Sequence, residues 1–178
     1  MKRFLGIMFI LLLLFLTGCL LNKTSEGGRK FPETINNPSK EGFYIVKKDK
    51  SGVTVVSAES EDFSDSGGEK EFYQAVVYSN VSKNVKIGQR VQIENDGPIL
   101  ESYPAQGKAK ATVLLPTYHP EGADLTEAQV VRKALNVLEE KFAWVPIIRE
   151  VVYHHALDNW EIKIQLEEVV YKVEIQDK

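Results

Sequence analysis

Short apolar runs separated by turn residues fill the chain from Gly42 to Leu115, and this pattern restricts the fold more than any other feature of the sequence. Runs of β-branched, aromatic or alternating apolar residues are typical of strands, and Gly, Pro, Asn and Asp between them are typical of turns. The pattern predicts strands at residues 43–46, 53–56, 72–78, 89–94, 99–103 and 109–115. Short strands with polar turns favour a small closed or nearly closed barrel, since closure hides the strand edges.

The spacing of the apolar residues changes in the last third of the chain. Pro116 and Pro120 indicate a linker over residues 116–122, and Thr126 and Gln129 fit a capping box. Apolar residues then recur at helical spacing through about Lys141, with Val137 and Phe142 on the apolar face. Alternating runs at 147–156, 160–166 and 169–175 predict three antiparallel strands. The fold class is therefore predicted to be α+β, a barrel followed by a helix on an antiparallel sheet.

The N-terminus is typical of a secretory signal. Lys2 and Arg3 precede thirteen residues, 4–16, that carry no charge, and Leu16-Thr17-Gly18-Cys19 follows. This tetrapeptide resembles the lipobox of bacterial lipoproteins, in which the chain is cut before a diacylated cysteine. Cys19 is the only cysteine, so no intramolecular disulfide competes for it. The alternative is an uncleaved membrane helix over residues 4–21, which barely reaches the length needed to span a bilayer.

The lipobox interpretation fixes a domain order and a location. We expect a signal peptide at 1–18, a flexible tether at 19–40 rich in Gly, Pro and polar residues, a barrel at 41–116 and an α+β module at 123–178. Two acyl chains on Cys19 would hold the protein durably at the membrane. The expected location is the extracellular face of a Gram-positive cell membrane.

The charge and composition exclude some classes of partner. The formal charge is −3, and removal of Lys2 and Arg3 with the signal would make it more negative. A nucleic-acid partner is therefore not expected, because phosphate binding requires a basic footprint. Catalytic serine motifs and phosphate-binding glycine loops do not occur in the sequence, so we predict no enzyme activity and no cofactor.

Two parts of the chain resemble known families. Residues 41–43 (EGF), 85–91 (VKIGQRV) and 97–106 (GPILESYPAQ) resemble the YobA-like family of unknown function, found in lipoproteins and secreted proteins of Gram-positive bacilli. This resemblance, over about residues 40–115, implies a small OB-like barrel. Residues 124–176 more loosely resemble a PepSY-like unit in the order of their elements, and that resemblance implies a regulatory or inhibitory role.

The segment from Gly97 to Leu114 holds the candidate site. Ile99 and Tyr103 would share one face of a short strand, and Pro104 would end it, so Tyr103 is expected to pack at a barrel corner with its hydroxyl bonded to the backbone. That interpretation makes the segment mostly structural. A binding role stays open for the corner because its polar residues are not explained by packing. The candidate residues are Glu101, Ser102, Tyr103, Pro104 and Gln106.

Other clusters favour ordinary structural roles. His154 and His155 would point to opposite faces of a strand and could not share a metal ion, so no metal site is predicted. The acidic residues at 59–71 lack the ligand spacing of a calcium loop. The barrel residues include aromatic rings that could stack on bases and cations that could bind phosphates of an oligonucleotide. The aromatic residues, however, lie at positions where a barrel core requires apolar side chains. The rings are Phe43, Tyr44, Phe72, Tyr73 and Tyr78, and the cations are Lys83, Lys86, Arg90, Lys108 and Lys110.

The leading hypothesis is a non-enzymatic cell-surface lipoprotein that binds an unidentified extracellular protein or envelope component. A regulator or inhibitor of an extracellular enzyme is the second hypothesis, and an unrecognised hydrolase is the third. The sequence does not distinguish the partners.

Overall fold

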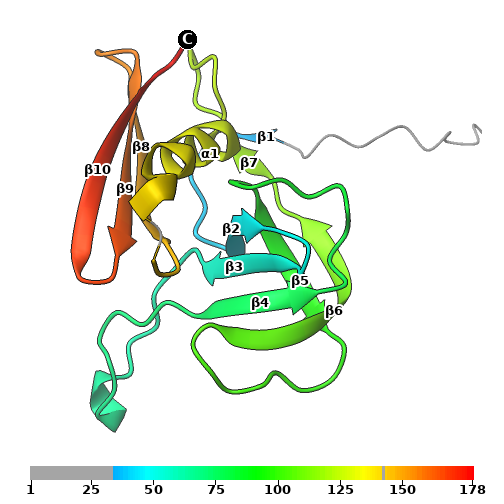
Figure 1. Ribbon diagram of the computed structural model, residues 1–178. Helices are drawn as coiled ribbons and strands as arrows, with labels where there is room; N and C mark the ends of the chain where they lie inside the picture. The colour runs from blue at the N-terminus through cyan, green and yellow to red at the C-terminus, as the bar shows by residue number, and fades with distance from the viewer. Residues whose placement is uncertain (1–33, 142) are drawn as a thin grey trace, which may run out of the picture. The chain divides into compact units, whose positions relative to one another are not determined.

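The computed structural model describes residues 34–141 and 143–178, and five strands between residues 43 and 114 close into a barrel (Figure 1). Neighbouring strands follow the order β2-β3-β4-β6-β5, with β5 hydrogen-bonded back to β2. All pairs are antiparallel except β4 with β6. The predicted closed barrel is confirmed. Its strands are β2 (Phe43–Lys48), β3 (Val53–Ser57), β4 (Ala75–Ser79), β5 (Arg90–Asn95) and β6 (Ala105–Leu114).

The hairpin of β2 and β3 is buried on both of its faces. Ile45 and Val55 point into the barrel interior, where they pack with Val76 and Val91. Tyr44, Val46 and Val56 point outward and are also buried, because they join the core of the C-terminal half. Burial on both faces explains why these strands are continuous apolar runs instead of alternating ones.

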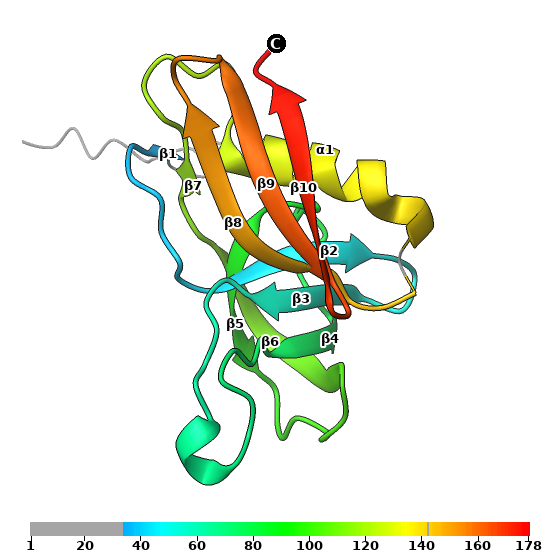
Figure 2. The same cartoon turned by 90° about the vertical axis from the view of Figure 1, so that its left-hand side faces the viewer.

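The C-terminal half is a helix on a three-stranded antiparallel sheet. Helix α1 (Glu127–Leu138) continues into the 3₁₀ turn η2 (Glu139–Lys141), and the capping box of Thr126 and Gln129 is present. The helix lies across the sheet, as Figure 2 shows. The alternation of Trp160, Ile162, Ile164 and Leu166 is confirmed, since all four are buried. The sheet order is β10-β9-β8, formed by β8 (Ile147–His154), β9 (Asn159–Leu166) and β10 (Val169–Gln176).

One hydrophobic cluster joins the two halves. It combines outward residues of the β2–β3 hairpin with Val130, Leu135 and Trp160 of the C-terminal half, and residues from Phe31 to Lys178 form one compact unit. Strand β1 (Thr34–Ile35) pairs in parallel with β7 (Thr117–Tyr118). The predicted tether and linker therefore both contain paired strands. Independent folding of the barrel stays a prediction.

Several local expectations differ from the structure. Residues 99–103 form no strand, because the chain folds back there and leaves a single bridge between Leu100 and Gln106. The alternation of Ala109, Ala111 and Val113 with polar residues predicts that all three share one face of the strand. A bulge between β5 and β6 reverses the pleat, so Ala109 is buried while Ala111 and Val113 are exposed.

Differences in the helical and acidic segments are smaller. Val137 is exposed on α1, and Phe142 lies outside the described residues. The acidic residues at 59–71, which predict a solvated loop, lie in a loop with one 3₁₀ turn, η1 (Ser64–Ser66). With a single α-helix, the described chain is mostly β rather than evenly α+β.

Candidate functional site

The candidate corner is a tight loop at the surface. Ser102 Oγ donates to the Pro104 carbonyl at 2.7 Å, and Glu101, Ser102 and Gln106 are exposed. Tyr103 is 46% exposed, and its ring packs edge-to-face with the ring of Phe72, with 6.3 Å between the centroids. The prediction of a packed Tyr103 with a bonded hydroxyl is wrong, because the fold-back places residues 101–104 at a loop tip outside the barrel. Partial burial, and then the charge of Glu69, raises the pKa of Tyr103.

Tyr103 and Pro104 line a groove of about 820 Å³ that also includes the segment after α1. Trp144, which is 57% exposed, lies on the wall contributed by that segment. The barrel side contributes Asp49 from the β2–β3 turn and Thr54 from β3. We call this hollow the aromatic groove. It brings together two exposed aromatic residues that are far apart in the sequence and come from the two halves of the chain.

The aromatic groove has a mixed apolar and polar lining and is close to neutral in charge. Lys47 and Lys48 line it together with Asp49 and Glu139, two cations against two anions. Lys47 pairs with Asp49 at 3.5 Å, and Lys48 Nζ donates to the carbonyls of Lys83 and Val85 at 2.9 and 2.8 Å. Since the cations are engaged by these partners, the groove has no concentrated positive charge for a polyanion.

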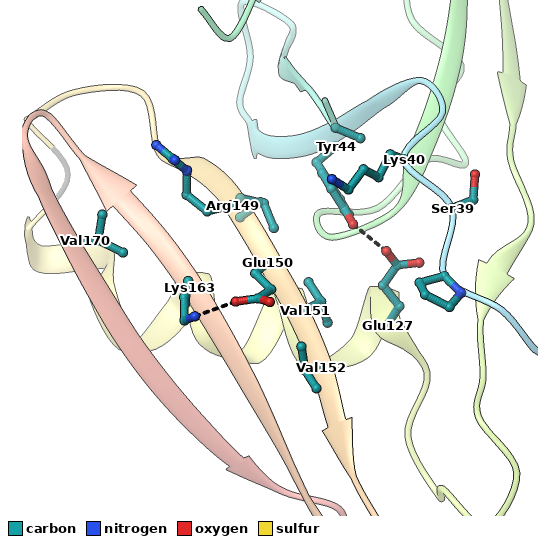
Figure 3. Close-up of a pocket in the computed structure, with 13 residues that line it drawn as sticks. Ser39, Lys40, Tyr44, Glu127, Arg149, Glu150, Val151, Val152, Lys163 and Val170 are labelled. Atoms are coloured by element: carbon teal, nitrogen blue, oxygen red, sulfur yellow. Dashed lines mark hydrogen bonds and ion pairs between the residues drawn. The ribbon is translucent and has the colours of Figure 1, made fainter. Parts of the chain in front are cut away.

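A second hollow, the inter-module cleft, lies between β8 and the barrel (Figure 3). Its volume is about 580 Å³, and Lys40, Tyr44 and Glu127 line one side while residues 148–152 of β8 line the other. Tyr44 and Glu127 meet where the barrel contacts the first turn of α1 (Figure 3). On the opposite wall, Glu150 forms an ion pair with Lys163 at 2.5 Å.

Tyr44, Arg90 and Glu127 form a buried polar cluster beside this cleft. The Tyr44 hydroxyl donates to Glu127 Oε1, and Arg90 Nε lies 3.4 Å from Oε2. Arg90 also donates to the carbonyls of Glu41 and Pro116 at 3.0 Å each. Burial, and then the negative charge of Glu127, raises the pKa of Tyr44 well above its usual value. The hydroxyl therefore stays protonated, and the cluster ties the barrel to α1.

The cluster corrects two interpretations from the sequence. Tyr44 and Arg90 were possible ring and charge contributors to an oligonucleotide site, but both are buried and engaged with Glu127. Glu127 lies between the capping-box residues Thr126 and Gln129 and is not among the candidate residues that the sequence indicates. Its sequence position at the start of a helix is where a carboxylate is ordinary, so no local signal marks it as the centre of a buried cluster.

The histidines have separate surroundings. His154 pairs with Glu161 at 3.5 Å, His155 is exposed with its ring against Tyr153, and His119 Nε2 donates to the Ala123 carbonyl at 2.7 Å. Across residues 34–141 and 143–178, no group of His, Cys, Asp and Glu is placed to hold a metal ion. Cys19 and the predicted signal lie outside the described residues. None of the helices in the described part of the chain is long and apolar enough to cross a membrane.

Residues 41–114 match the profile of a family described as "Protein of unknown function (DUF3221)". The matched range covers the closed barrel and ends at the last residue of β6. No curated protein and no solved structure matched the chain. The family match therefore supports the barrel as a recurring unit and gives no activity.

Proposed function

We propose that this protein is a non-enzymatic binding module of the cell surface and that its ligand occupies the aromatic groove. The observation that carries the proposal is the meeting of Tyr103 and Trp144, both about half exposed, in one groove of about 820 Å³. Large aromatic side chains are costly to leave in water, and partly exposed rings that share a concave surface are typical of binding sites.

The barrel topology supports the same location. The order β2-β3-β4-β6-β5, closed and with β4 parallel to β6, is consistent with the OB-like barrel that the YobA-like resemblance implies. OB-type barrels bind extended polymers on their second and third strands and at the loops after the first and fourth. In this chain those elements are β3, β4, the turn containing Asp49 and the loop containing Tyr103. All four line the aromatic groove.

The groove chemistry favours a neutral, hydroxyl-rich ligand. Trp144 and Tyr103 offer flat apolar faces, and Asn136, Ser51 and Thr54 offer hydrogen-bonding groups beside them. A cell-wall glycan combines apolar ring faces with hydroxyl and amide groups. Nucleic acid is disfavoured, because base-stacking sites also require a positive groove that follows the phosphates. The C-terminal half, which resembles a PepSY-like unit, takes part in the proposed site because it supplies Trp144.

Binding to isolated cell-wall glycan tests the groove. Trp144→Ala and Tyr103→Ala are each expected to weaken binding by about tenfold, by analogy with the stacking of nucleic-acid bases on aromatic side chains, where one contact is worth about 1–3 kcal/mol. Leu157→Ala is the matched control, because Leu157 is also a large exposed apolar residue but lies in the β8–β9 turn outside the groove. Folded Trp144 and Tyr103 variants that bind as tightly as the control would refute the groove as the binding site.

The lipid anchor has its own test. Diacylation of Cys19 would place the module on the extracellular face of the membrane with the tether between them. Cys19→Ala is expected to leave a full-length precursor without lipid. Metabolic labelling with a palmitate analogue decides the question, and label that persists in the variant would disprove the anchor.

A further inference from the structure

The two edges of the C-terminal sheet differ in regularity. Strand β8 has a bulge between Ile148 and Glu150 and lies beside the inter-module cleft. Strand β10, at the other edge, pairs with β9 without interruption from Val169 opposite Leu166 to Gln176 opposite Asn159. Figures 1 and 2 show β10 on the outer side of the sheet. A bulge is a common device that prevents pairing with another chain, and β10 lacks it.

The outer edge of β10 is open within the described residues. Its one strand partner there is β9, so the backbone groups directed away from β9 have no strand to pair with. Val169 and Val170, at the start of the strand, are 52% and 50% exposed. A regular, eight-residue edge with exposed valines is a template for another strand.

We infer that β10 pairs antiparallel with β10 of a second copy of this chain, with Val173 at the two-fold axis. In an antiparallel pair, opposite residues point to the same face of the sheet. A register centred on Val173 sets Lys172 opposite the partner's Glu174, and symmetry repeats this pair. Centring the register on Lys172 or on Glu174 would oppose two like charges, which is destabilising.

The apolar face also continues through the Val173 register. Tyr171, Val173 and Ile175 point toward α1 and pack with the core. In this register Tyr171 lies opposite the partner's Ile175, so the apolar row of one sheet extends into the next. Lys172 contacts Glu161 at 2.9 Å and Glu174 at 3.0 Å within one chain, and pairing adds the partner's carboxylate to this charge network.

A single strand pair gives a small interface, so we expect a weak, reversible dimer. Stable dimers generally bury at least about 1,200 Å² in total, which one strand pair does not reach by itself. The site is independent of the aromatic groove, because none of the groove-lining residues belongs to β10. Failure of one proposal therefore leaves the other intact.

The test uses two full-length copies that carry different affinity tags and are co-expressed. Wild-type copies are expected to co-purify after chemical cross-linking in the cells, which retains a weak, reversible dimer. Lys172→Glu alone and Glu174→Lys alone are each expected to reduce co-purification at least about tenfold, because each turns two cross-strand ion pairs into like-charge contacts. A mixture of the Lys172→Glu chain with the Glu174→Lys chain restores both pairs and should recover it.

The mixture distinguishes a lost interface from a lost fold, since misfolded variants would not recover pairing. The matched control reverses Lys110 and Glu94, an exposed cross-strand ion pair on the barrel, and should leave co-purification unchanged. Wild-type copies that fail to co-purify would overturn the inference. A mixture that pairs no better than the single variants would overturn it as well.

Discussion

Removal of the Glu127 carboxylate is expected to destabilise the protein severely. Glu127 is 3% exposed, and Arg90, its ion-pair partner, is 4% exposed. In Glu127→Ala the guanidinium would keep its two carbonyl acceptors but lose its only counter-charge among the described residues. The Tyr44 hydroxyl and the Tyr118 amide, which also donate to Glu127, would lose an acceptor.

The magnitude follows from the burial of these groups. Breaking a buried ion pair by removing one partner typically costs about 3–5 kcal/mol, because the remaining charge stays buried without compensation. The lost hydrogen bonds act in the same direction, at about 1–3 kcal/mol for each donor left unsatisfied. Relaxation and water entry offset part of the sum, so we expect a loss of about 4 kcal/mol in the free energy of unfolding.

Urea denaturation of the unit Phe31–Lys178, followed by the fluorescence of the buried Trp160, measures this loss. Glu140→Ala is the matched control, since Glu140 is exposed just after α1 and should change stability by less than about 0.5 kcal/mol. The double variant Arg90→Met/Glu127→Leu should be more stable than Glu127→Ala, because no buried charge remains. A loss below about 1 kcal/mol in Glu127→Ala would refute the cluster as the tie between barrel and helix.

Three other predictions concern packing, pH and modularity. Gly88→Ala should lower the free energy of unfolding by about 2–4 kcal/mol in a thermal unfolding experiment, because an added Cβ would lie 2.2 Å from the Ala128 carbonyl oxygen of α1. Gly97 has a similar positive φ but open space around it, so Gly97→Ala carries the backbone strain alone. Burial tends to raise the pKa of Asp177, but hydrogen bonds from Asp124, Trp160 and Leu125 outweigh it and lower the pKa. The contribution of Asp177 to the free energy of unfolding is therefore present above about pH 4 and is lost as pH falls through the folded-state pKa. Asp177→Asn should flatten the acid side of a plot of stability against pH, and an unchanged acid side would contradict this. Residues 40–117 alone should show dispersed amide resonances, since the barrel has an interior core of its own. Residues 123–178 alone should not, because their core includes barrel residues. A spectrum without dispersion from the first fragment would count against the module boundary.

The local pattern of the sequence predicted most of the elements. The β2–β3 hairpin, the capping box at Thr126 and the alternation from Trp160 to Leu166 each follow from interactions between residues near in sequence. Barrel closure was also predictable, because several short strands without an obvious covering element need closure to hide their edges.

The positions of individual side chains at the site depended on the tertiary structure. Tyr103 was expected to pack at a barrel corner, but the fold-back from Leu100 to Gln106 leaves it 46% exposed at a loop tip, where it lines the same groove as Trp144 of the other half of the chain. Similarly, the bulge opposite Glu94 exchanged the buried and exposed faces of β6. A bulge or a loop fold-back changes the direction of every following side chain without changing the apolar pattern that predicts the strand.

The sequence by itself therefore determined most of the strands and the helix, although not the fold-back at 99–103, and it favours a lipid-modified N-terminus at Cys19. The tertiary structure decided that Glu127 and Arg90 meet in a buried cluster and that Tyr103 and Trp144 share a groove. The physical reason is the sequence distance over which the interactions act. Secondary structure is encoded by neighbours within a few residues, whereas these contacts join residues about forty positions apart, whose approach is set by the packing of the barrel against the helix and sheet.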